Sequence, residues 1–218
     1  DYLDLAYVQA LSLKCSQKIN SYAVIVDKET NKQVTDKHRK VFDYVIDVVG
    51  DASDDPFGLE PSVFRLTPFK ETVKLESDLL FTRSIDHWWT AFRLKNVCLS
   101  TGAKNCLGLN PTIRKYRELF DANNLPDVYN GLMYFRYSQT AAQFFSLARS
   151  VFLNWPTVAK ELTKVSDTSA NTDMAYAVVC KIMGVENTTI PAADFINFIH
   201  MKPGINGWPE NTEFHKGM

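Results

Sequence analysis

The sequence predicts an α/β fold in which a mostly parallel sheet is flanked by helices within a single domain. Short apolar runs rich in β-branched residues alternate along the chain with segments whose apolar residues recur every three or four positions. This alternation is typical of parallel sheets that are covered on both faces. The length of 218 residues fits one domain of this kind.

The expected strands are short apolar runs bounded by turn residues. The clearest two are residues 22–26, which end before Asp27, and residues 44–49, which end before Gly50. Further strands are expected at residues 72–77, 96–100, 129–135 and 194–200.

The expected helices carry apolar stripes at helical spacing. The most regular stripe runs from Ala141 to Trp155 and ends at Pro156, and we interpret it as core packing. A second stripe near the C-terminus stops at Gly184, a residue type that commonly ends helices. The other helices are expected at residues 2–20, 62–70, 84–92 and 112–121.

Composition limits the function classes. Hydrophobic residues make up 45% of the chain, enough for a substantial core. The formal net charge of −1 provides no overall basic footprint for nucleic acid. Four scattered cysteines without a C-x-x-C pair are typical of a reducing compartment, so we expect a cytoplasmic protein. No apolar run approaches the ~18 residues that cross a bilayer, so no membrane partner is expected.

An acidic pair lies at the end of the strand expected at residues 72–77. Glu76 and Asp78 are two positions apart, so in an extended segment their carboxylates share one face. Two neighbouring carboxylates repel unless a cation or a proton lies between them, which makes this pair a candidate metal site. A solvated acidic pair is the alternative. Ligands of parallel α/β sheets bind beyond the carboxyl ends of strands, and this position favours the metal.

The C-terminal tail carries a second polar group of residues. His200 and Lys202 follow the strand expected at residues 194–200 and share one face ahead of a loop rich in glycine and proline. Imidazole binds divalent transition metals, and an ammonium group pairs with phosphate. The alternatives are a structural histidine and a surface lysine.

Taken together, these motifs resemble those of nucleotide-sugar glycosyltransferases with the GT-A (Rossmann-like) fold. The resemblance rests on the order of elements, on Glu76-Ser77-Asp78 after a strand, on Asn130-Gly131 within a strand, and on H-x-K-P-G-x-x-G-W from His200 onward. It extends over nearly the whole chain. The chain is most similar to the glycogenin-like retaining enzymes of glycosyltransferase family eight, and among them to glycosyltransferases of large tailed phages.

The resemblance implies a donor site. Asp78, Glu76 and His200 would hold Mn²⁺ or Mg²⁺, and Glu76, in place of the family's usual Asp, would also contact the nucleotide ribose. Lys202 and Gly204 would contact the diphosphate of a nucleotide-diphosphate sugar, with a UDP-sugar as the expected donor. Lys202 stands closer to His200 than the corresponding lysine does in the family motif.

The resemblance also implies two catalytic candidates. Asn130 would line the acceptor side, and Asp173, at the start of a late helix, would lie near the transferred sugar. Asn171 is an alternative for the second position, and Asp173 is otherwise an ordinary first-turn acid favoured by the helix dipole.

The resulting expectation is a metal-dependent, retaining glycosyltransferase. A hydroxymethylated base of phage DNA in the host cytoplasm is one candidate acceptor, and a protein or a glycan is another. One alternative function is a non-catalytic GT-A module for binding or assembly. Another is a different nucleotide-binding α/β domain, although the sequence contains no glycine-rich phosphate loop.

The N-terminus departs from the family pattern. The family begins with a strand whose following loop holds the nucleotide base, whereas this sequence opens on an expected helix. We therefore expect a GT-A domain over residues 1–218, completed in the native chain by a short strand upstream of Asp1.

Overall fold

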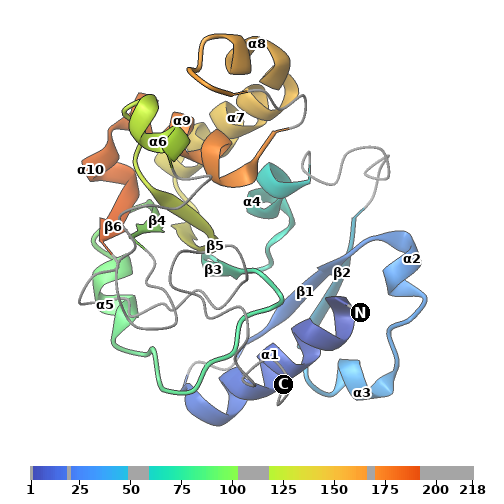
Figure 1. Cartoon of the computed structure of the whole chain (residues 1–218). Coiled ribbons are helices and arrows are strands. Elements are labelled where there is room, and N and C mark those ends of the chain that lie inside the picture. Colours follow the sequence, from blue (N-terminus) through green and yellow to red (C-terminus); the bar gives the residue numbers. More distant parts are fainter. Residues whose placement is uncertain (1, 19–20, 49–58, 103–117, 166–169, 192–218) are drawn as a thin grey trace, which may run out of the picture.

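The computed structural model describes residues 2–18, 21–48, 59–102, 118–165 and 170–191. Within these ranges the chain forms two sheets surrounded by helices (Figure 1). One sheet has four strands in the order β3–β5–β4–β6, and the other pairs β1 with β2. No helix in these ranges is both long and apolar enough to cross a membrane.

The four-stranded sheet is built around its longest strand, β5 (Val128–Arg136), which is buried in all but its last residue. Strand β5 runs antiparallel to both β3 (Glu71–Leu75) and β4 (Val97–Thr101). On the far side β4 pairs in parallel with the short strand β6 (Thr189–Pro191). Apart from Asn130, Gly131 and Arg136, β5 consists of aliphatic and aromatic residues, as expected of a strand that is covered on both faces.

Helices cover both faces of this sheet. The main core cluster joins β4 and β5 to α7 (Gln139–Leu153) and α9 (Thr172–Met183). Helix α7 begins at Ser138, whose hydroxyl accepts the N–H of Ala141 at 3.2 Å. The second core cluster packs α5 (Trp88–Phe92) against β4 and β5. The remaining short helices of this part are α4 (Val63–Leu66), α6 (Glu118–Ala122), α8 (Trp155–Lys160), α10 (Val185–Thr188) and a 3₁₀ turn, η1 (Glu60–Ser62).

The two-stranded sheet pairs β1 (Ala23–Val26) in parallel with β2 (Tyr44–Asp47). Helix α1 (Tyr2–Ser16) lies along it, and α2 (Lys28–Asn31) and α3 (Asp36–Arg39) connect its two strands (Figure 1). Its core is small: the buried members are Ala10, Val41 and Phe42.

The α/β fold with helices around the sheets confirms the expected fold class: β1 is parallel to β2, and β3, β4 and β6 run in one direction, so that β5 alone is antiparallel to its neighbours. The larger sheet is mixed, because β5 runs against both of its neighbours. A strand buried on both faces is apolar throughout in either direction, so the residue pattern of β5 does not reveal its orientation.

Most expected elements lie within a few residues of the observed ones, and the differences are local. Residues 84–87 precede α5 instead of belonging to it, and the stripe from Ala141 to Trp155 is divided between α7 and α8, with Pro156 in the first turn of α8. The strand expected at residues 194–200 lies outside the described residues.

Candidate functional site

The candidate site begins where β3 ends. The N–H of Glu76 donates to the carbonyl of Gly131 at 3.0 Å, so the pairing with β5 continues one residue beyond β3. The Gln9 side chain of α1 donates to the carbonyl of Glu76. The Tyr129 hydroxyl donates to Glu76 Oε2 at 3.3 Å. Glu76 is thus held by α1 and β5, while Asp78, two residues further on, is exposed.

A buried contact joins the two residues expected to be catalytic. Asn130 on β5 is fully buried, and its N–H donates to Asp173 Oδ1 at 2.7 Å. Asp173 is 9% exposed and stands in the first turn of α9. The Asn171 side chain instead caps this helix by accepting the N–H of Met174 at 3.2 Å. It is therefore Asp173, and not Asn171, that contacts β5.

An ion pair that sequence reasoning missed lies against Asn130. Lys74 Nζ on β3 is 2.9 Å from Glu60 Oε2 in η1, and the side chains are 12% and 24% exposed. Lys74 also donates to the carbonyl of Asn130 at 3.3 Å, and Asn130 Nδ2 donates to Glu60 Oε2 at 3.4 Å. The signal in the sequence is a lysine between two apolar residues, Val73 and Leu75, of an expected strand.

Two buried polar atoms beside this ion pair lack partners. The Tyr176 hydroxyl on α9 and Asn130 Oδ1 have no hydrogen-bond partner within the described part of the chain. Burial, and secondarily the charge of Glu60, raises the pKa of Tyr176 well above its usual range, so this group stays a neutral phenol. Unsatisfied polar atoms are uncommon in a core, and one of these two belongs to Asn130, a residue that was expected to be catalytic.

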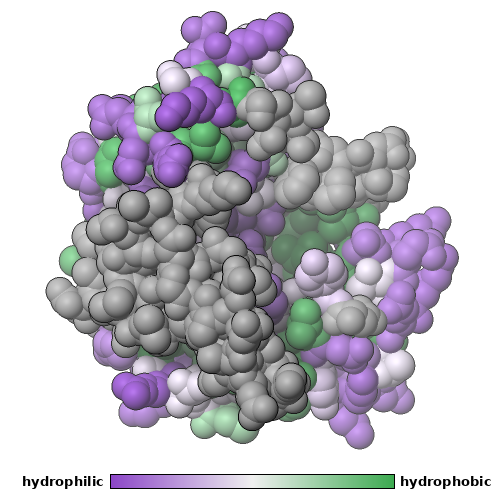
Figure 2. Space-filling view, in the orientation of Figure 1, coloured by the Kyte–Doolittle hydropathy of each residue, from purple (hydrophilic) through white to green (hydrophobic). Residues whose placement is uncertain are grey.

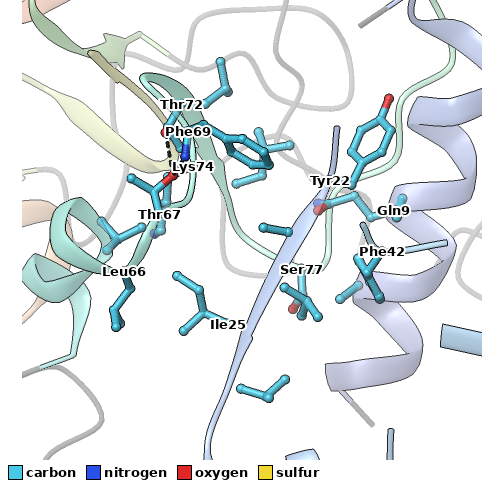
Figure 3. A pocket seen from close by; sticks show the side chains of 18 of the residues that line it. Gln9, Tyr22, Ile25, Phe42, Leu66, Thr67, Phe69, Thr72, Lys74 and Ser77 are labelled. Atoms are coloured by element: carbon cyan, nitrogen blue, oxygen red, sulfur yellow. Dashed lines mark hydrogen bonds between the residues drawn. The ribbon is translucent and has the colours of Figure 1, made fainter. Parts of the chain in front are cut away.

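A cavity of about 590 Å³ opens beside the site, between β1 and β3. Apolar residues of α1, β1 and α4 form much of its wall, and Glu60 also lines it. Figure 3 shows Lys74 on the β3 side of the cavity. In the space-filling view, apolar surface is visible in a recess between the two-stranded sheet and the rest of the molecule (Figure 2).

The expected donor-site residues are only partly within the described structure. His200, Lys202 and Gly204 lie outside it. Within the described ranges no three His, Cys, Asp or Glu side chains group as a metal site. Glu76 and Asp78 nevertheless supply the oxygen ligands that Mg²⁺ or Mn²⁺ prefers, and Mg²⁺ is commonly held by one or two carboxylates together with substrate phosphates. The pair fits that ligand set.

Comparisons with known proteins define the class of fold. No protein-family model and no curated protein matches the chain. Among solved structures it is similar to a glycosyltransferase, and the chain therefore has a glycosyltransferase-like α/β fold. That structure is the apo form of mouse xyloside xylosyltransferase 1, with a TM-score of 0.52 and 11% sequence identity. The match covers 88% of this chain and 80% of the mouse chain.

Proposed function

We propose that this protein is a metal-dependent glycosyltransferase that moves a sugar from a nucleotide-diphosphate sugar to an acceptor hydroxyl. The observation that carries the proposal is the buried 2.7 Å hydrogen bond between Asn130 and Asp173. These residues are 43 positions apart, and the family resemblance of the sequence implies a role in the site for both. Their position beside the strand end that carries Glu76, in a glycosyltransferase-like fold, supports the same conclusion.

In this proposal, Glu76 and Asp78 hold a divalent metal together with His200. The metal supplies a Lewis acid for the charge that develops on the diphosphate leaving group. Lys202 and Gly204 contact the same diphosphate. Because Gln9 and Gly131 fix the backbone of Glu76, the acidic pair keeps its position when the donor arrives.

Asp173 lies near the transferred sugar and orients it, and Asn130 belongs to the acceptor side. A carboxylate accepts hydrogen bonds from sugar hydroxyls, and the N–H of Asn130 fixes the direction of the Asp173 carboxylate. The Glu60–Lys74 pair holds both the carbonyl and the side-chain amide of Asn130. We therefore assign Asp173 to the sugar, Asn130 to the acceptor side and to positioning Asp173, and Glu60 and Lys74 to positioning Asn130.

The finer expectations belong to the same proposal. They are a glycogenin-like relationship, retention at the transferred carbon, a UDP-sugar donor, and action in the cytoplasm on a hydroxymethylated base of phage DNA. The net charge of −1 does not favour a DNA acceptor over a protein or a glycan, so the acceptor panel has to include all three.

The donor site is tested by thermal shift with nucleoside diphosphates and their sugars, with and without Mn²⁺. We expect a rise in Tm that requires both nucleotide and metal. It should disappear in Asp78→Ala and persist in Asp36→Ala, a matched loss of an exposed carboxylate on α3. Absence of any nucleotide-dependent shift would rule the proposal out.

Catalysis is tested by release of nucleoside diphosphate from the donor in the presence of each acceptor class. Asp173→Asn should lower turnover by at least about 100-fold, the usual cost of losing one well-placed electrostatic group, while the metal-dependent nucleotide shift remains. Nucleotide binding without turnover on any acceptor would instead identify a non-catalytic module.

A further inference from the structure

Helix α1 carries apolar residues on both of its long faces. The face toward the two-stranded sheet is buried at Ala10 and Leu13. At 3.6 residues per turn, Val8, Leu11 and Cys15 lie on the opposite face. All three are exposed, Val8 by 51%. A surface helix normally has polar residues on its outer face, and a helix that is apolar all round is normally covered on both sides.

The segment that follows β3 extends this outer apolar surface. The N–H of Phe81 donates to Ser12 Oγ at 3.1 Å, which places the segment against the flank of α1. Leu80, one residue earlier, is 63% exposed, and Leu5, two helical turns before Ser12 on the same flank, is exposed as well. We call this surface the α1 patch, and its members are Leu5, Val8, Leu11, Cys15 and Leu80.

The two ends of the α1 patch carry opposite charges. Asp4 lies at the N-terminal end of the stripe, and Lys14 and Lys18 lie at the C-terminal end. All three are exposed, and the contact of Asp4 with Lys37 at 3.2 Å is itself exposed on both sides. The surface that complements this pattern is an apolar stripe with the same charges in the reverse order. A second α1 that runs in the opposite direction has that order.

We infer that the α1 patch is the contact between two copies of this protein, whose α1 helices pack antiparallel across a twofold axis. Two-fold contacts are the commonest kind in homo-oligomers, and they bring the same patch of both copies together. In the register that pairs the apolar residues, Val8 of one copy lies beside Leu11 of the other. Asp4 then lies level with Cys15 of the other copy, within about one helical turn of Lys14 and Lys18 there.

The charges favour a second copy over an anionic membrane surface. Asp4 lies in line with Val8 and Leu11 on the outer face, so a negatively charged surface that reached these residues would also meet its carboxylate. Two helices of 15 residues bury less than the about 1,600 Å² of a standard interface. The dimer should therefore be weak and should dissociate on dilution.

Helix α1 also supports the segment that carries the acidic pair. Gln9 donates to the carbonyl of Glu76. The Gln17 side chain donates to the carbonyl of Arg83 at 3.0 Å and accepts the N–H of Ile85 at 2.6 Å. A contact between copies along α1 thus lies directly behind the candidate site. The inference depends on the surface of α1, and it holds whether or not the proposed function is correct.

The first test is sedimentation velocity of the 218-residue chain over a range of protein concentrations. The wild type should form a concentration-dependent dimer. Val8→Lys should raise its dissociation constant at least about 100-fold, because the symmetric contact would bury two unpaired ammonium groups. Leu153→Lys is the matched control, since Leu153 is 66% exposed at the end of α7. A wild type that stays monomeric, or equal dissociation constants for the two variants, would overturn the inference.

The same variants reveal whether another segment of the same chain covers the α1 patch instead. In that case the wild type would remain monomeric at every concentration. Val8→Lys, but not Leu153→Lys, would then lower Tm, because the substitution would disturb an internal contact. This outcome would also overturn the inference.

Cross-linking tests the antiparallel arrangement. In Asp4→Cys, oxidation by air with copper–phenanthroline should join the introduced thiol to Cys15 of the other copy, as two thiols lose two protons and two electrons to oxygen. In the wild type the two Cys15 residues would lie 11 positions apart along the helices, about 16 Å, which is too far for a disulfide. Cross-linking of the wild type to the same extent as Asp4→Cys, or of neither, would overturn the arrangement.

Discussion

The four-stranded and two-stranded sheets of this protein differ in how completely their strands are buried. Strand β5 of the larger sheet is covered on both faces, and eight of its nine residues are buried. In β1 one residue of four is buried, and in β2 none is. The rigid part of the candidate site, Asn130 with Asp173, therefore belongs to the larger sheet. The smaller sheet depends on its packing against α1.

The largest expected loss of stability comes from removing a buried phenylalanine, and it should differ between the cores of the two sheets. Phe144 is fully buried and stacks on Tyr176 in the main core, whereas Phe42 belongs to the small cluster under β1 and β2. Phe144→Ala should cost about 3–5 kcal/mol in the free energy of unfolding, the usual range for a well-packed phenylalanine. Phe42→Ala should cost less, because its sparser surroundings can relax into the space. Denaturant unfolding of both variants measures the difference, and an equal or larger loss in Phe42→Ala would contradict the contrast.

The next largest loss of stability should come from breaking the buried hydrogen bond between Asn130 and Asp173. Asp173→Ala leaves the N–H of Asn130 buried without its acceptor, which should cost about 1–3 kcal/mol of stability. Asp173→Asn is the matched control, since its amide oxygen can still accept this hydrogen bond. Comparable losses in the two variants would mean that the negative charge, and not the hydrogen bond, is what the fold requires.

The smaller sheet should be the pH-sensitive region. Burial lowers the pKa of His38 on α3, with a further contribution from Lys37. Its Nδ1 accepts the N–H of Thr35 at 3.0 Å, a role that only an unprotonated Nδ1 can fill. The folded state thus favours neutral His38, so its stabilising contribution is present above the unfolded pKa of about 6.5 and is lost as the pH falls below it.

We therefore expect the Tm of the wild type to fall by a few degrees between pH 7.5 and pH 5.5, and this fall to be smaller in His38→Gln. His87→Gln, at an exposed position beside α5 on the larger sheet, is the control. If His87→Gln flattened the pH profile as much as His38→Gln does, the pH sensitivity would not belong to the smaller sheet.

The smallest change in stability should come from removing an ion pair on the surface of the larger sheet, between Arg93 and Glu71. Arg93 donates to Glu71 at 2.8 Å and holds the pKa of that carboxyl below its usual value, but about half of the Arg93 side chain is exposed. Exposed ion pairs contribute about 0–1 kcal/mol, so Arg93→Ala should change stability by less than about 1 kcal/mol, and less still at high salt. A double-mutant cycle with Glu71→Gln isolates the pair energy. A coupling well above that range would show that the start of β3 depends on this surface pair.

Residue patterns predicted elements well where the pattern has a single structural solution. The stripe in α7 and the apolar run of β5 were located within a few residues, because a buried helix face and a doubly covered strand each require a particular apolar spacing. The short helices α2, α3 and α10 were missed, since four-residue helices are too short to show periodicity.

The candidate site was predictable only in part. Glu76 and Asp78 are two residues apart, so both follow β3 in any fold, but Ser77 and Asp78 lie in a turn instead of the expected extended segment. The contact of Lys74 with Glu60 joins residues 14 positions apart through the placement of η1. Neither residue matched a motif, and only the assembled core brings both to Asn130.

The sequence by itself determined that the chain forms an α/β fold, where most strands and helices lie, and which carboxylates follow β3. Those properties depend on local spacing and on the burial of apolar side chains, which act over a few residues. The tertiary structure alone decided the antiparallel direction of β5, the choice of Asp173 over Asn171 as its partner, and the gap between β1 and β3. These features depend on which backbone edges meet, and hydrogen bonds between distant strands leave no trace in the local order of residues.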